Sequence, residues 1–217
     1  MTILALEFSS PQRSVAVLKA EGASVAAEAV ETGGHGTNAF GMIEQALAEA
    51  KIEREQIEAI AIGLGPGSYT GIRAAISIAQ GWQLARGANL LGVSSAEAIA
   101  AQAQAEKILG RVNVVIDAQR NELYLASYEI TADGWREIAP LDILSQAEVQ
   151  SRAAAEGILI GPEVTRWFPA GRLVLPRAAV IAELAACRSD FKPGEKLVPI
   201  YLRETNFVKA PPARIAN

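Results

Sequence analysis

The order of strand-like and helix-like segments is the feature that most restricts the fold of this chain. Three short runs of strand type, Thr2–Phe8, Arg13–Lys19 and Ser24–Val30, follow one another with only turn-forming residues between them. Helix-like and strand-like segments then alternate, at residues 38–50, 58–64, 72–86, 89–93 and 94–107. Strands joined by short turns predict an antiparallel meander, and strands joined through helices predict parallel pairing. The sequence therefore predicts an α/β fold with a mixed sheet.

The second half repeats a looser version of this order. Apolar strands are expected at Val112–Ile116 and Leu123–Ile130, with further elements at residues 145–155 (helix), 158–160 (strand) and 178–187 (helix). Residues 193–217 contain four of the ten prolines and read as an extended tail. The order of the first half fits a ribonuclease-H-like lobe of the kind found in actin-like ATPases (the ASKHA fold). A structural duplication would then give an N-terminal lobe over residues 1–107 and a smaller C-terminal lobe with the tail over residues 108–217.

The loop between the second predicted helix and the strand before it carries the strongest local motif. Its candidate functional residues are Gly65, Gly67, Ser68, Thr70 and Gly71. Glycine allows close backbone approach, and Ser68 or Thr70 can cap the helix. Backbone amides at a helix start could contact a phosphate, but the same residues suit a tight, closely packed strand-to-helix connection. The loop is neither a P-loop nor a dinucleotide-binding fingerprint, because both consensus patterns are missing.

Few side chains could perform metal or nucleophilic chemistry. His35 and Cys187 are the only histidine and the only cysteine, so they cannot form a typical transition-metal site or an intrachain disulfide. We expect Cys187 to be a buried structural thiol. Glu7 ends the first strand, where it could face a metal-bound nucleotide or make local hydrogen bonds. Asp117 could be a catalytic or metal-binding carboxylate, or it could cap a turn. No catalytic residue, cofactor or metal ligand is assigned.

Composition limits the partners that this chain can bind by itself. The formal net charge is −4 and the pI is about 5.2 over 217 residues. A nucleic-acid-binding surface normally carries a basic excess, so any contact with RNA is expected to come through a partner. No apolar run reaches the length of about 20 residues that spans a bilayer, and no signal peptide is recognisable at the N-terminus. A cytoplasmic location is the expectation.

The two early helices carry more apolar residues than one face can hold. The candidates for a core or partner-interface role are Phe40, Ile43 and Leu47 on the first helix and Ile76, Gln80 and Gln83 on the second. Ile72, Ile76, Ile78, Trp82 and Leu84 do not lie on one side of the second helix. A homodimer or heterodimer through these helices is therefore expected.

Several motifs, in order along nearly the whole chain, resemble the TsaB (YeaZ) family. They are Ile3-Leu4-Ala5-Leu6-Glu7-Phe8-Ser9-Ser10, the loop Gly63-Leu64-Gly65-Pro66-Gly67-Ser68-Tyr69-Thr70-Gly71-Ile72-Arg73, Gly92-Val93-Ser94-Ser95, Ile116-Asp117-Ala118-Gln119-Arg120-Asn121-Glu122-Leu123-Tyr124 and Pro199-Ile200-Tyr201-Leu202-Arg203. The resemblance implies two actin-like lobes. It also implies a non-catalytic scaffold subunit of the complex that adds threonylcarbamoyl to the adenosine next to the tRNA anticodon. The implied partners are a TsaD homologue, in a heterodimer, and the ATPase TsaE.

Two departures from the family pattern bear on activity. TsaD-type relatives carry a His-x-x-x-His metal motif on the first helix, whereas here Ala39 takes the place of the second histidine. Glu7 stands where the family pattern has Asp. Both departures agree with a subunit that has no turnover of its own. The alternatives from other classes are a metallopeptidase of the M22 (glycoprotease) type, which lacks its ligands here, and an ATP-dependent kinase of the sugar-kinase type, for which the chain is short.

Overall fold

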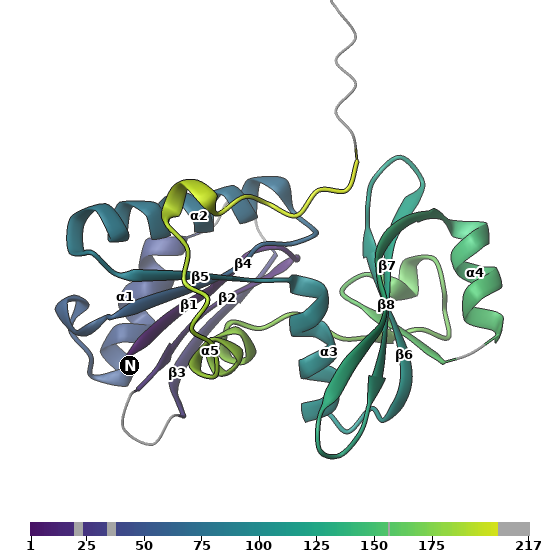
Figure 1. Ribbon diagram of the computed structural model, residues 1–217, viewed down its shortest axis with the longest axis horizontal. Helices are drawn as coiled ribbons and strands as arrows, with labels where there is room; N and C mark the ends of the chain where they lie inside the picture. Colours follow the sequence, from purple (N-terminus) through teal and green to yellow (C-terminus); the bar gives the residue numbers. More distant parts are fainter. Residues whose placement is uncertain (20–23, 34–37, 156, 204–217) are drawn as a thin grey trace, which may run out of the picture.

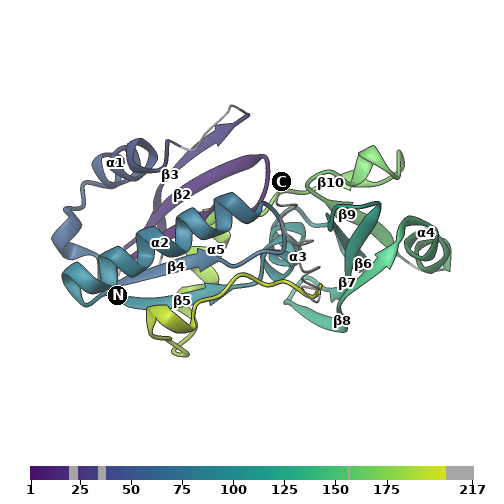
Figure 2. The same ribbon diagram turned by 90° about the horizontal axis from the view of Figure 1, so that it is seen from above.

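Two mixed β-sheets, each flanked by helices, make up the protein (Figure 1). The computed structural model describes residues 1–19, 24–33, 38–155 and 157–203. Figure 2 shows the two sheets in two lobes side by side, with helix α3 between them. The predicted α/β class with two mixed-sheet lobes is confirmed.

The first sheet has the strand order β3-β2-β1-β4-β5. Its strands are β1 (Ile3–Glu7), β2 (Gln12–Leu18), β3 (Val25–Thr32), β4 (Ala59–Gly63) and β5 (Asn89–Val93). The first three strands pair antiparallel, as the meander predicted, and β4 and β5 add in parallel. β1 and β4 are buried along their whole length because helices cover both faces of the sheet.

Alternate residues of β1 point into two different cores. Leu4 and Leu6 pack against α1 (Ala39–Ala50) and α2 (Tyr69–Arg86). Ile3 and Ala5 pack instead against α5 (Ala178–Ala186), on the opposite face. Successive side chains of a strand point to opposite faces of the sheet, so β1 contributes to both cores. The first lobe therefore has three layers: α1 and α2, the sheet, and α5.

The second sheet repeats the strand order of the first. Its order is β10-β9-β6-β7-β8, with β6 (Gly110–Asp117), β7 (Glu122–Ile130), β8 (Trp135–Ser145), β9 (Ile158–Gly161) and β10 (Arg172–Leu173). Again the first three strands are antiparallel and the last two parallel. Helix α3 (Ser95–Ala105) packs on one face, and α4 (Gln146–Ala155) contacts β7 and β8. The matching order indicates a structural duplication.

Strands β8 and β10 are absent from the sequence-based prediction. Both lie at the edges of the second sheet, where only one neighbour is needed. β8 contains Pro140 and is mostly half-exposed, so it lacks the apolar run that marks a central strand. β10 has only two residues, both exposed.

The predicted second lobe, residues 108–217, needs correction at its C-terminal end. Helix α5 contacts β1, β2 and β4, so the chain returns to the first lobe from Ala178 onwards. The short helical turn η3 (Gly194–Lys196) then lies against α2, and Leu197 joins the core of the first lobe. β1 and β4 carry apolar residues on both faces of the first sheet, and α1 and α2 cover only one of these faces. Helix α5 returns to the first lobe because it buries the other face. In the described residues, none of the helices is both long and apolar enough to cross a membrane.

Candidate functional site

The glycine-rich loop between β4 and α2 is bonded to two other segments. The Ser68 amide donates to the carbonyl oxygen of Ser9 at 2.7 Å, which fixes the loop to the turn after β1. The carbonyl of Gly65 accepts from the Ser95 amide at 2.8 Å, at the start of α3. Two of the polar backbone groups that could have faced a ligand are therefore used inside the protein.

Two glycines of this loop leave no room for a side chain. A Cβ atom on Gly71 would overlap the carbonyl oxygen of Phe8, and one on Gly67 would overlap that of Ser9. Gly67 also has a φ of +146°, which side chains disfavour. The sequence left two interpretations open, a phosphate contact and a tight strand-to-helix connection, and the close packing at these glycines matches the second.

Helix α2 begins earlier than the sequence indicates. The predicted start was Ile72, whereas the helix starts at Tyr69. Ser68 is its N-cap, and the Gly71 amide donates to the Ser68 hydroxyl oxygen at 3.3 Å. Thr70, the other capping candidate, is exposed in the first turn.

Glu7 is fully buried, and both of its carboxylate oxygens have partners. Oε1 accepts from the Ser9 amide at 2.5 Å, and Oε2 accepts from the Ser95 hydroxyl at 3.0 Å. Burial raises the pKa of the Glu7 carboxyl, and the hydrogen bonds from Ser9 and Ser95 offset part of that shift. Gly63 makes room for the carboxylate, since a Cβ there would overlap Oε2. Of its two predicted roles, Glu7 has the local one: it ties β1 to α3.

A polar cleft of about 550 Å³ lies between the two lobes. Its walls are the turn after β1, the glycine-rich loop, the β6–β7 turn and the segment after β9, with the lining residues Ser9, Ser10, Gly67, Ser68, Asp117, Gln119, Arg120, Asn121, Glu163 and Arg166 among others. Asp117 accepts from the Gln119 amide at 2.7 Å, so it caps the β6–β7 turn as one of its predicted roles required. Its other oxygen lies 3.7 Å from Arg166. Burial, followed by the nearby Asp117 charge, raises the pKa of Glu163.

The second notable surface is a groove along α1 and α2. It has a volume of about 680 Å³ and is mainly apolar, with the lining residues Ala39, Phe40, Arg54, Ala74, Ser77, Ile78, Gly81, Trp82, Ala85 and Arg86. Phe40 is 71% exposed beside it. We call this surface the α1–α2 groove.

The six interface candidates from the sequence separate into three groups. Ile43, Leu47 and Ile76 are buried in the core of the first lobe, so a partner cannot reach them. Phe40 was expected on the same helix face as Ile43 and Leu47, but it points to the α1–α2 groove instead. The helical period explains this, because the buried face of α1 is centred on Met42, Ile43, Ala46 and Leu47.

Gln80 and Gln83 have intramolecular roles. Gln80 donates from its side-chain amide to the carbonyl of Gly194 at 2.8 Å, and Gln83 accepts from the Gly194 amide at 2.8 Å. They hold the returning C-terminal segment on α2. The prediction overlooked Ala74, Gly81 and Ala85, which line the groove because their small side chains leave it open. Their spacing along one helix face was a usable signal.

In the part of the chain that the structure describes, no group of three or more His, Cys, Asp or Glu side chains could hold a metal ion. His35 lies outside the described residues, and Ala39 is buried at the start of α1. Cys187 was expected to be buried but is exposed, because α5 ends at Ala186 and turns it outward.

Comparison with known proteins places these features in a family. The family model described as TsaD, tRNA N6-adenosine threonylcarbamoyltransferase, matches residues 29–186. The tRNA threonylcarbamoyladenosine biosynthesis protein TsaB of Haemophilus influenzae is 31% identical, over 97% of this chain and 98% of its own length. The protein of that name from Escherichia coli is 30% identical, over 80% and 82%.

A solved structure agrees with the sequence relatives. YeaZ from Pseudomonas aeruginosa superimposes with a TM-score of 0.78 at 30% identity, covering 93% of this chain and 99% of that one. Both the length and the fold therefore match over nearly the entire chain, and the chain belongs to the TsaB (YeaZ) family.

Proposed function

We propose that this protein is a non-catalytic scaffold subunit of the complex that adds threonylcarbamoyl to the adenosine next to the tRNA anticodon. It pairs with a TsaD-type subunit, and the ATPase TsaE joins the pair. The relatives that carry the name tRNA threonylcarbamoyladenosine biosynthesis protein support the process. The observation that carries the scaffold role is the α1–α2 groove.

The groove has the composition of a helix-docking surface. Ile78 and Trp82 of α2 are only partly buried by this chain, and Phe40 projects beside them from α1. Apolar surface exposed together in this way favours a protein partner. A TsaD-type subunit of the same fold offers two equivalent helices, so the two proteins can bury four helices against each other.

Two residues, Glu7 and Ala39, support the proposal that this subunit has no catalytic activity of its own. Glu7 is enclosed by hydrogen bonds from Ser9 and Ser95 and does not line the interlobe cleft. Ala39 has no metal-binding group at the position where the TsaD-type motif has its second histidine. The metal and the transfer chemistry then belong to the partner. Neither the metallopeptidase nor the kinase alternative gains support from the geometry of the cleft.

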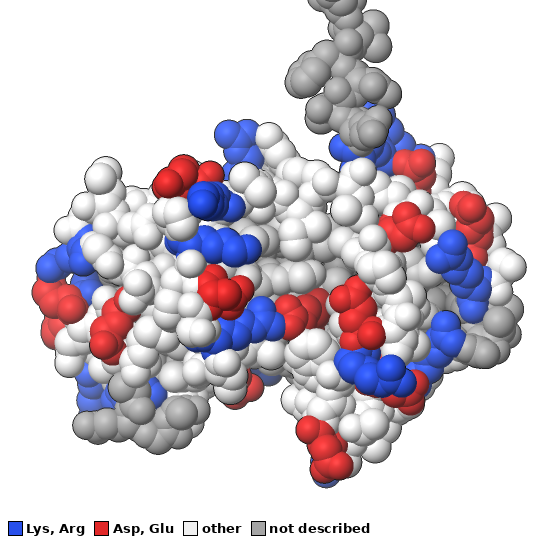
Figure 3. All heavy atoms as spheres, viewed as in Figure 1, with Lys and Arg blue, Asp and Glu red and all other residues white. Residues whose placement is uncertain are grey.

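The charge distribution favours an indirect contact with tRNA. On the face drawn in Figure 3, basic and acidic side chains are interspersed, and the whole chain has a net charge of −4. Binding of a polyanion would favour clustered Lys and Arg. The tRNA contact is therefore assigned to the complex.

The decisive experiment measures binding to the purified TsaD homologue of the same organism. Ala74→Arg places a long charged side chain in the groove and should weaken that binding by at least about tenfold, because the charge would be buried without a partner. Leu173→Arg, at an exposed edge of the second lobe, is the matched control and should bind as wild type does. tRNA modification in the reconstituted system should fall in parallel with binding. Full binding and modification by Ala74→Arg would refute the proposed docking site.

A further inference from the structure

The chain crosses between the lobes in two places, and a third connection is non-covalent. The covalent crossings are α3, between β5 and β6, and the segment that leads from β10 to α5. Residues 192–203, which we call the terminal strap, run along the α2 side of the first lobe and end beside the second lobe (Figure 1). This third connection lies away from α3 and α5.

The strap is firmly held by the first lobe. The Lys192 amide donates to the carbonyl of Leu90, on the edge strand β5, at 2.8 Å. The Ile200 amide donates to the carbonyl of Leu64 at 2.8 Å. Between these points Leu197 is only 3% exposed and packs in the core of the lobe. The strap up to Ile200 is therefore part of the first lobe.

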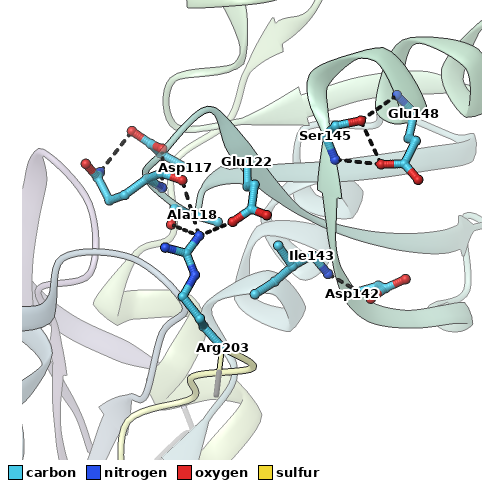
Figure 4. Close-up of polar contacts among 9 residues, drawn as sticks. Asp117, Ala118, Glu122, Asp142, Ile143, Ser145, Glu148 and Arg203 are labelled. Atoms are coloured by element: carbon cyan, nitrogen blue, oxygen red, sulfur yellow. Dashed lines mark hydrogen bonds and ion pairs between the residues drawn. The ribbon is translucent and has the colours of Figure 1, made fainter. Parts of the chain in front are cut away.

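The last described residues of the strap contact the second lobe. Arg203 donates to the carbonyl oxygens of Ala118 and Gln119, at 3.2 and 3.4 Å, and to the carboxylate of Glu122 (Figure 4). The backbone of Leu202 is hydrogen-bonded to the Tyr124 hydroxyl. A single guanidinium nitrogen, Nη2, thus lies within hydrogen-bond distance of three acceptors around the β6–β7 turn.

The turn that Arg203 holds has an unusual backbone. Gln119, Arg120 and Asn121 all have positive φ, at 63°, 58° and 62°, although none is glycine. Such residues adopt this conformation only where the surroundings impose it. The same three residues line the interlobe cleft. Arg203 therefore supports one wall of the cleft from outside.

We propose that the terminal strap is an interlobe latch that sets how far the cleft opens. Arg203 holds the β6–β7 turn, and Leu197 anchors the strap to the first lobe. Tyr201 packs against Tyr69 at the start of α2, with ring centroids 5.3 Å apart and the rings tilted by 41°, and so stiffens the strap between these two points. When Arg203 is released, the second lobe moves relative to the first and the cleft widens.

The test compares the wild-type protein with Arg203→Ala, in a Cys187→Ser background that carries spin labels at Glu49→Cys and Gln150→Cys. These two positions are exposed and lie on α1 and α4, one in each lobe. Arg203→Ala should broaden the distance distribution between the labels. It should also speed amide exchange in residues 118–124 by roughly tenfold. Without the Arg203 side chain, local opening of this turn no longer requires its hydrogen bonds to be broken and so costs less free energy.

Three variants make the result specific. Arg203→Lys keeps the charge on a shorter side chain and should give an intermediate effect, because its ammonium group reaches the three acceptors less well. Glu122→Gln removes the charge partner and should shift exchange in the same direction as Arg203→Ala. Lys196→Ala removes an exposed charge from the part of the strap that lies on the first lobe and should leave both measurements unchanged. Wild-type distances and exchange in Arg203→Ala would overturn the latch.

Discussion

At the scale of single residues, close packing explains why the glycine-rich loop needs its glycines. Gly71 and Gly81 lie in the same helix, α2, but their surroundings differ: a Cβ on Gly71 would overlap the Phe8 carbonyl, whereas one on Gly81 would meet no atom within 4 Å. Gly71→Ala should therefore destabilise the protein by about 1–3 kcal/mol, since the backbone at Phe8, directly after β1, must shift. Gly81→Ala should stabilise it by up to about 1 kcal/mol, from helix propensity alone.

Urea unfolding of the two variants separates these effects. Equal midpoints for Gly71→Ala and wild type would contradict the packing role of the loop. The larger Gly71→Val should lower tRNA modification in the reconstituted system through loss of folded protein, and thermal melting of that variant alone checks this cause.

Glu7 makes the stability of the protein depend on pH. Its pKa in the folded state is raised above 4.5 by burial, so between 4.5 and that raised value the folded protein binds the proton that the unfolded chain releases. Stability attributable to Glu7 therefore falls as pH rises through this window. Glu7→Gln carries no such charge and should gain stability relative to wild type as pH rises above 4.5.

The exposed carboxylate of Glu148 is a control, because its effect on stability has the opposite pH dependence. Hydrogen bonds from Ser145 lower the pKa of Glu148 in the folded protein. The stability that Glu148 contributes is therefore present above its pKa in the unfolded chain, and it is lost as pH falls through its lower pKa in the folded protein. Urea unfolding of Glu7→Gln above pH 4.5 and of Glu148→Gln below pH 4.5 measures the two slopes. A pH-independent difference between Glu7→Gln and wild type would contradict a buried, titrating Glu7.

At the scale of the elements, the returning C-terminal segment offers a test of the corrected lobe boundary. Neighbouring residues of the strap have opposite environments, since Leu197 is 3% exposed and Val198 is 62% exposed. Leu197→Ala should cost about 2–4 kcal/mol by leaving a cavity in the first lobe, and Val198→Ala should change stability by less than about 0.5 kcal/mol. Chemical denaturation of the two variants measures this. Similar midpoints for both would mean that the strap does not belong to the core.

The central elements could be predicted from sequence, and the peripheral ones could not. β1 and β4 are apolar almost throughout and β6 has a buried centre, because both of their faces are covered, and these apolar runs are visible in the chain itself. β8 and β10 are edge strands whose pairing depends on neighbours distant in sequence. The packing of α5 on the first sheet likewise depends on tertiary contacts, since the apolar residues of α5 could pack against either lobe.

The site shows the same division between local and long-range information. The cap at Ser68 and the turn at Asp117 were among the local interpretations and follow from residue type and position. Separating Phe40 from Ile43 and Leu47 required knowing which side of α1 the sheet covers. The pairing of Gln80 and Gln83 with Gly194 joins residues more than a hundred positions apart, so no local pattern could reveal it.

At the scale of the whole molecule, one surface is expected to serve two assemblies. The α1–α2 groove is exposed in the single chain, and a second copy of the chain offers the same apolar helices. An isologous contact through α1 and α2 is then the simplest way to cover it when no other partner is present. Sedimentation velocity should therefore show a homodimer that forms as the protein concentration rises, and Ala74→Arg should remain monomeric.

Competition for the same groove makes this prediction sharper. If the homodimer and the pair with the TsaD homologue use one surface, added TsaD homologue should convert homodimer into heterodimer rather than bind to its outside. The sedimenting species should then contain one copy of each chain, with no complex of two scaffold chains and one TsaD chain. Leu173→Arg should behave as wild type in both steps. A ternary complex that retains the homodimer would place the two interfaces on different surfaces, and the groove could then serve only one of them.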